Sequence, residues 1–176
     1  MITNRKTTIL SPWVTLVEKT LHLKSGPALY HSFQQNDYVA ILAVREDGKI
    51  PIVRQFRNAA EQWTWELPGG YVDTGSTTLE ACHQELYEEV GLKVQEAHYL
   101  GSYITDGGRL DNKLHSFLVT AISDKNFIPE PDVEPSFVSL TELTTMVKDN
   151  EFISALHLST LFLASHHPKF QEIINP

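Results

Sequence analysis

Three glutamates in one short segment are the residues of this sequence best suited to carry chemistry. Glu85, Glu88 and Glu89 stand at positions i, i+3 and i+4, so on a helix they project from one face. Like charges at this spacing repel by roughly 0.2–0.5 kcal/mol per pair. A hard divalent cation would turn that cost into a ligand set, because Mg²⁺ prefers carboxylate oxygens together with substrate phosphates and water. A solvated acidic helix face would show the same three residues.

The segment that precedes these glutamates favours metal binding over a solvated face. Residues 67–70, Leu-Pro-Gly-Gly, predict a turn after a short strand, and a polar loop follows them. The loop enters the predicted helix at its N-terminal end, where Thr77 and Glu80 have the spacing of a capping box. Glycines at such a place let backbone groups approach a metal or a phosphate closely.

Residues 69–92 resemble the Nudix box, G-x5-E-x7-R-E-U-x-E-E-x-G-U, in which U is an apolar residue. Two positions depart, because Ser76 stands in place of the first glutamate and Gln84 in place of the arginine. In the family this pair resembles a structural brace, and replacing both members leaves two neutral groups rather than one unpaired charge. The resemblance implies the family's fold over about residues 37–145. The matching positions are Gly70, Glu85, Leu86, Glu88, Glu89, Gly91 and Leu92.

The resemblance implies metal-assisted hydrolysis of a nucleoside diphosphate linked to another moiety. It assigns Glu85 and Glu89 as the principal ligands of Mg²⁺, for which Mn²⁺ can substitute. Glu88 becomes an additional ligand or a water-orienting group, and the Gly69 carbonyl becomes a backbone ligand. A metal in this place neutralises the diphosphate and lowers the pKa of an attacking water, while a carboxylate accepts the proton.

The general base is expected in the polar loop of residues 105–113, because Glu85 and Glu89 are occupied by metal. Asp106 and Asp111 are the carboxylates of this loop, and we assign the role to Asp111. In the ADP-ribose branch of the family a loop glutamate often takes this role. The aligned residue here is Asn112, whose amide cannot accept a proton, so the base must shift or the activity is modest.

Arg54 and Arg57 are the predicted phosphate-binding residues. They lie in the segment Val-Arg-Gln-Phe-Arg, which resembles the Q-[YF]-R motif of the ADP-sugar pyrophosphatases, and arginine suits bidentate phosphate contacts. Salt bridges to Glu61 or Glu66 explain the two arginines equally well. Glu66 is also a candidate for hydrogen bonds to sugar hydroxyls, and Arg109 is a candidate for closing the polar loop over phosphate.

Composition narrows the choice of partners and compartment. The chain has 176 residues, of which 14 are basic and 22 acidic, so its formal net charge is −8. With no basic run, it is a poor candidate for nucleic acid or an anionic membrane surface. Cys82 is the single cysteine, which rules out an intrachain disulfide and fits a reducing compartment. We therefore expect a cytoplasmic protein.

The order of predicted elements, together with the resemblance, predicts an α+β protein: a Nudix-type α/β/α sandwich with a mixed sheet, preceded by a small N-terminal antiparallel β layer. Apolar periodicity indicates each element. Asp47 and Gly48 predict a tight hairpin turn. The predicted strands span 13–21, 28–33, 38–44, 50–56, 63–67, 94–103, 114–121 and 137–140, and the predicted helices span 77–91, 141–148 and 152–165.

Two hypotheses about function follow. The first is a pyrophosphatase acting on ADP-ribose or another nucleotide sugar, with residues 1–36 as a dimerisation or substrate-side segment and residues 37–176 as the hydrolase domain. The chain resembles a branch of the family whose members form dimers with the N-terminal sheet contributed across the interface, so we expect a homodimer. The loop after the box lacks the proline usual for ADP-ribose specificity, which leaves other nucleotide sugars open. The second hypothesis is a domain that binds a nucleotide metabolite without cleaving it.

Overall fold

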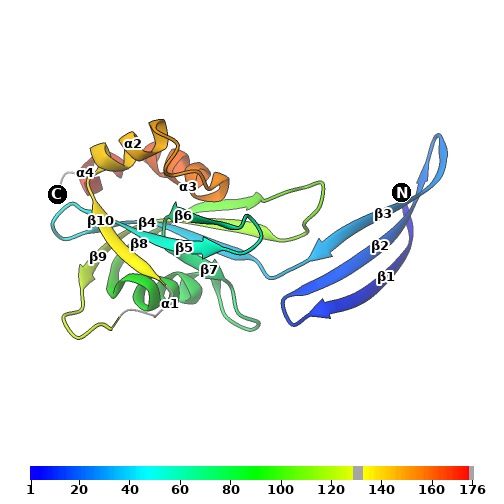
Figure 1. The fold of residues 1–176 in the computed structure, drawn as a ribbon, viewed down its shortest axis with the longest axis horizontal. Coiled ribbons are helices and arrows are strands. Elements are labelled where there is room, and N and C mark those ends of the chain that lie inside the picture. Colours follow the sequence, from blue (N-terminus) through cyan, green and yellow to red (C-terminus); the bar gives the residue numbers. More distant parts are fainter. Residues whose placement is uncertain (129–132, 175–176) are drawn as a thin grey trace.

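The computed structural model describes residues 1–128 and 133–174, and these residues form three β-sheets and four helices (Figure 1). Residues 129–132 and 175–176 of the predicted 37–176 domain lie outside the described residues. The strands are β1 (Ile2–Ser11), β2 (Val14–Leu23), β3 (Gly26–Gln34), β4 (Tyr38–Arg45), β5 (Ile50–Arg57), β6 (Gln62–Glu66), β7 (Gly69–Tyr71), β8 (Leu92–Ile104), β9 (Lys113–Ser123) and β10 (Glu134–Val138). The helices are α1 (Thr78–Val90), α2 (Leu140–Lys148), α3 (Ala155–Ser165) and α4 (Phe170–Ile174).

The first three strands form an antiparallel sheet that projects away from the rest of the molecule (Figure 1). This confirms the predicted N-terminal β layer, although β1 was not predicted because polar and basic residues fill most of it. The sheet is tied to the loop before β9 at Phe33, whose amide donates to the Arg109 carbonyl at 2.7 Å. The Phe33 carbonyl accepts from the Asp111 amide at 3.2 Å.

The central sheet is mixed, with strand order β7-β4-β9-β8, and β4 runs parallel to β9. Strand β4 is apolar on both faces, as a strand covered from both sides must be. Val39 and Ile41 pack in the cluster that includes α1, while Leu42 and Val44 pack in the cluster that includes α2, α3 and α4. The two helical layers therefore lie on opposite sides of the sheet (Figure 1).

A second, smaller sheet has the strand order β10-β5-β6. The predicted Asp47–Gly48 turn forms, with the Gly48 amide donating to the Arg45 carbonyl at 2.8 Å and Gly48 at a φ of 75°. The expectation of a hairpin was wrong, however, because β4 and β5 belong to different sheets. The turn passes the chain from one sheet to the other, and β5 brings Gln55 to Glu89, near the C-terminal end of α1.

Helix α1 begins and ends as its sequence predicts. Thr77 accepts from the Glu80 amide, and the Glu80 side chain accepts from the Thr77 amide, which completes the capping box. Gly91 closes the helix in the left-handed conformation at a φ of 66°. Cys82 is buried against the sheet, and burial raises the pKa of its thiol to about 12, so this thiol is unreactive.

Gly69 and Gly70 were predicted as part of a turn, but together with Tyr71 they form the short strand β7, which pairs antiparallel with β4. The prediction was wrong because glycines have low strand propensity, yet here the sheet needs them. A Cβ on Gly69 would lie 2.2 Å from the Val39 carbonyl oxygen, so no other residue could come this close to β4. Among the described residues, no helix is long and apolar enough to cross a membrane.

Candidate active site

Glu89 joins α1 to the glycine turn. Its Oε2 accepts from the Gly69 amide at 2.9 Å, and its Oε1 accepts from Gln55 Nε2 at 2.5 Å. Only 6% of Glu89 is exposed. Burial, opposed by the hydrogen bond from the Gly69 amide and reinforced by the negative charge of Glu85, raises the pKa of its carboxyl to about 8. A buried carboxyl beside a second one is a place where a cation would be strongly favoured.

Glu85 lies directly against the second glycine of the turn. A Cβ added to Gly70 would sit 2.3–2.5 Å from the Glu85 carboxylate, so the missing side chain makes room for this group. This is the observation that tests whether the site fits a metal. Two carboxylates and a main-chain turn converge where only glycine leaves space, and hard oxygen donors of this kind suit Mg²⁺ or Mn²⁺.

Ser76 and Gln84, the two departures from the box, are exposed, whereas Glu88 is half-buried. Gln84 Nε2 donates to Glu88 Oε1 at 3.1 Å, so the residue in the arginine position holds Glu88. The Ser76 amide donates to the Asp73 carbonyl at 3.0 Å within the loop. In residues 1–128 and 133–174, no three His, Cys, Asp or Glu side chains are gathered so as to hold a metal ion. The three-glutamate ligand set stays a prediction.

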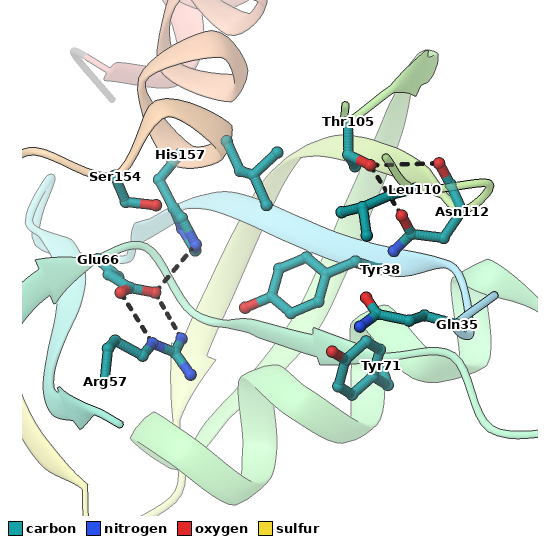
Figure 2. A pocket seen from close by; sticks show the side chains of 11 residues that line it. Gln35, Tyr38, Arg57, Glu66, Tyr71, Thr105, Leu110, Asn112, Ser154 and His157 are labelled. Atoms are coloured by element: carbon teal, nitrogen blue, oxygen red, sulfur yellow. Dashed lines mark hydrogen bonds and ion pairs between the residues drawn. The ribbon is translucent and has the colours of Figure 1, made fainter. Parts of the chain in front are cut away.

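A cavity of about 230 Å³ opens next to the glycine turn (Figure 2). Tyr38 connects the cavity to the Gly69–Gly70 segment. Its ring lines the cavity, and its hydroxyl donates to the Gly69 carbonyl at 2.9 Å. Burial raises the pKa of Tyr38 well above its usual value, so the hydroxyl keeps its proton. The lining residues are Gln35, Tyr38, Arg57, Glu66, Tyr71, Thr105, Leu110, Asn112, Ser154, Leu156 and His157.

Arg57 and Glu66, both predicted, meet in the wall of this cavity. Arg57 donates from Nε and Nη2 to the two Glu66 oxygens at 2.9 and 2.5 Å, and Thr64 Oγ1 donates to Oε1 at 2.5 Å. Burial alone would raise the pKa of Glu66, but hydrogen bonds from Arg57, His157 and Thr64 hold it well below its usual range. The salt-bridge interpretation of Arg57 is therefore realised, and this carboxylate has four donors around it.

His157 is a cavity residue that the sequence did not predict. It comes from α3, is 1% exposed, and places Nε2 3.1 Å from Glu66 Oε2 (Figure 2). A single histidine within the apolar run of residues 152–164 was the available signal. Gln55 was not predicted either, although it is the glutamine of the Q-[YF]-R segment, because arginine and not glutamine is the residue typical of phosphate contacts.

The other predicted site residues do not line the cavity. Arg54 forms a salt bridge with Glu134 at 3.3 Å on the surface. The Arg109 carbonyl accepts a hydrogen bond from the Phe33 amide of β3. Asp111 is exposed, and its Oδ1 accepts from the Gln35 amide at 3.3 Å. Their roles in binding and catalysis stay predictions. Asn112 does line the cavity and is buried, and its correspondence to the family's loop acid stays a prediction.

The NUDIX domain model matches residues 35–156, so the chain belongs to the Nudix family. It is 32% identical to the methanol dehydrogenase activator of Bacillus methanolicus, over 60% of this chain. It is 31% identical to the ADP-ribose pyrophosphatase of Bacillus subtilis (strain 168), over 66% of this chain. The matches span 57% and 65% of those two relatives, less than two thirds of either.

Similarity to a solved structure covers almost the whole chain. The crystal structure of an ADP compounds hydrolase matches with a TM-score of 0.78 and 22% identity, over 97% of this chain and 95% of that one. At this identity the match establishes the fold alone. It confirms the α+β Nudix architecture with its mixed sheet and its additional N-terminal antiparallel sheet.

Proposed function

We propose that this protein hydrolyses the diphosphate linkage of a nucleoside diphosphate derivative, in a reaction that depends on Mg²⁺ or Mn²⁺. The products would be a nucleoside monophosphate and a phosphorylated moiety. One observation carries the proposal: Glu85 and Glu89 of α1 are packed against a turn whose two glycines leave room only for carboxylates and backbone. Membership in the Nudix family supports it.

The chain's residues take distinct parts in this proposal. Glu85 and Glu89 would hold the metal, with Glu88 and the Gly69 carbonyl as further ligands. The metal, when bound, would neutralise the diphosphate and make water a stronger nucleophile. Arg57, kept in position by Glu66, would bind phosphate oxygens at the cavity. Asp111 is proposed to accept the proton, because it is a carboxylate of the loop that borders the cavity.

The proposed substrate is ADP-ribose or another nucleotide sugar. The B. subtilis relative is named an ADP-ribose pyrophosphatase, and the solved structure is named an ADP compounds hydrolase. The cavity adds support, since Gln35, Thr105, Asn112 and Ser154 line it with amides and hydroxyls. Groups of this kind suit a sugar.

The test is incubation with Mg²⁺ and a panel of ADP-ribose, GDP-mannose, ADP-glucose, NADH and diadenosine polyphosphates, with released mononucleotide as the readout. We expect turnover that EDTA abolishes. Glu89→Gln keeps the side-chain volume and should lower kcat/KM at least about 100-fold, the effect of losing one preorganised electrostatic group. Glu172→Gln, on the exposed face of α4, is the matched control and should retain full activity.

The second candidate function is binding without cleavage. The replacement of the family's loop acid by Asn112, together with Ser76 and Gln84 in the box, favours it. Tight nucleotide binding with no product at any metal concentration would replace the hydrolase proposal with this one.

A homodimer, with residues 1–36 as its interface and residues 37–176 as the hydrolase domain, is proposed for the assembly. Large apolar side chains are exposed on the projecting sheet, among them Ile9 at 79% and Trp13 at 69% exposure. Exposed groups of this size on a protruding sheet are typical of a protein–protein interface.

A further inference from the structure

Gln55 of β5 binds one of the two carboxylate oxygens of Glu89. Its Nε2 donates to Glu89 Oε1 at 2.5 Å, while the Gly69 amide donates to Oε2 at 2.9 Å. The donors belong to β5 and β7, and the acceptor belongs to α1. With one hydrogen bond on each oxygen, the carboxylate group cannot rotate without breaking both contacts. Three separate elements therefore fix the orientation of Glu89.

The register of the smaller sheet explains why Gln55 reaches α1. Gln55 lies opposite Thr64 in the β5–β6 pairing, so their side chains project to the same side of the sheet. Val53 precedes Gln55 by two residues and shares this side, and it packs in the core cluster that includes α1. Arg57 and Glu66 follow at the same alternation. One face of the β5–β6 pair thus carries both the donor to Glu89 and the Arg57–Glu66 pair.

The two neutral residues in the box do not provide the contacts that hold Glu89. Gln84, which stands in the arginine position, donates to Glu88 Oε1 at 3.1 Å. The Ser76 amide makes its hydrogen bond within its own loop. The hydrogen bonds to the Glu89 carboxylate come instead from Gln55 and the glycine turn, both outside the helix. In this chain β5 therefore supplies a support for the α1 carboxylates that the box does not specify.

We propose that Gln55 is a positioning residue for divalent-metal binding at Glu89. Each carboxylate oxygen has about two lone-pair sites, so each oxygen of Glu89 keeps one for a cation after the donors are bound. A ligand held in place by a neighbouring group binds metal more strongly than a mobile one. Gln55 acts through Glu89 and does not line the cavity. The inference rests on the proposed function, because it takes Glu89 as a metal ligand.

The experiment measures Mn²⁺ binding to the full chain by electron paramagnetic resonance, without substrate. Gln55→Met nearly keeps the length and volume of the side chain but removes the donor, and its Kd for Mn²⁺ should rise about 10–100-fold. Gln55→Asn keeps the amide on a shorter side chain and should also weaken binding. Gln95→Met is the matched control, because Gln95 is exposed on β8, and its Kd should equal that of the natural protein.

Two further measurements distinguish a positioning role from a purely structural one. Urea denaturation without metal should show a single cooperative transition for Gln55→Met, which establishes that the variant is folded. In the turnover assay, the Mg²⁺ concentration for half-maximal activity should rise by about the same factor as the Kd for Mn²⁺. The KM for the substrate at saturating Mg²⁺ should not change, since Gln55 does not line the cavity. If Gln55→Met does not fold, Gln55→Asn serves for the same comparison.

The outcomes separate this inference from the hydrolase proposal. Equal Kd values for the natural protein, Gln55→Met and Gln95→Met would overturn the role of Gln55 and leave the hydrolase proposal intact. Tighter Mn²⁺ binding by Gln55→Met would also overturn it, because Gln55 would then compete with the metal for Glu89. Mn²⁺ binding that depends on Gln55 in a protein that releases no mononucleotide would refute only the hydrolase. A natural protein that binds no Mn²⁺ would overturn both.

Discussion

Replacing Gly69 and Gly70 one at a time should distinguish the glycine that the fold requires from the glycine that the proposed metal site requires. A Cβ on Gly69 would lie 2.2 Å from the backbone oxygen of Val39, inside the central strand. The backbone cannot yield there, so Gly69→Ala should lower the free energy of unfolding by about 3 kcal/mol, the upper end for overpacking a core. The three atoms nearest to a Cβ on Gly70 all belong to the carboxylate of Glu85, the far end of a flexible side chain.

Gly70→Ala should therefore fold and yet lose activity. The nearest contact of 2.3 Å must open to ordinary van der Waals distance, which moves the Glu85 carboxylate by about 1 Å. A misplacement of that size costs roughly 100-fold in rate. We expect kcat/KM to fall by about that factor, the Mg²⁺ dependence to move to higher concentration, and the unfolding free energy to change by less than about 1 kcal/mol.

The assay pairs urea denaturation with turnover of the best substrate from the panel. Gly107→Ala is the matched control, because its Cβ would meet Ile104 at 3.4 Å, an ordinary contact, outside the turn. It should leave both stability and activity unchanged. If Gly70→Ala remains fully active at low Mg²⁺, Glu85 is not a metal ligand in the position described. If Gly69→Ala is as stable as the natural protein, the close approach of β7 to β4 is not what requires glycine.

Three further predictions concern acid stability, proton transfer and assembly. The pKa of folded Glu66 lies below the ordinary value of 4.5, so its contribution to stability is complete above pH 4.5 and is lost as pH falls through the folded value. Glu66→Gln should reduce the loss of thermal stability at acid pH, and it should lower the free energy of unfolding by about 2–3 kcal/mol at neutral pH. This is less than for a wholly buried ion pair, because Arg57 stays partly solvated. If the variant loses stability at acid pH just as the natural protein does, another carboxyl is responsible for that loss. Asp111→Asn should lower kcat by about 10²–10⁴ with little change in KM, and stopped-assay kinetics that show natural kcat would remove Asp111 as the base. Ile9→Lys or Trp13→Ser should turn a dimer into a folded monomer in sedimentation velocity, whereas a monomeric natural protein would contradict the proposed interface.

Interactions between residues close together in the sequence determined much of the fold. The ends of α1 follow from Thr77, Glu80 and Gly91 alone, because capping depends on residues within one turn of each other. The unbroken apolar run of β4 predicted a strand covered on both faces, and the structure confirms it. The fixed spacing of glycines and acids in the box was sufficient to indicate the Nudix family, and the match over residues 35–156 confirms that membership.

The tertiary structure determined which of these elements contact one another. Gly69–Tyr71 forms a strand because it pairs with β4, which lies about 30 residues earlier in the chain. The neighbouring proline and glycines indicate only a turn, so the sequence predicted a turn there. The cavity joins Arg57 and Glu66 to His157, which lies about 90 residues further along the chain. No spacing rule connects residues that distant, because their contact depends on how α3 packs over the sheet. The sequence by itself thus indicated the acidic face of α1 and the two glycines that precede it, whereas the pairing of those glycines with β4 and the partners of Glu66 depend on how the layers pack together.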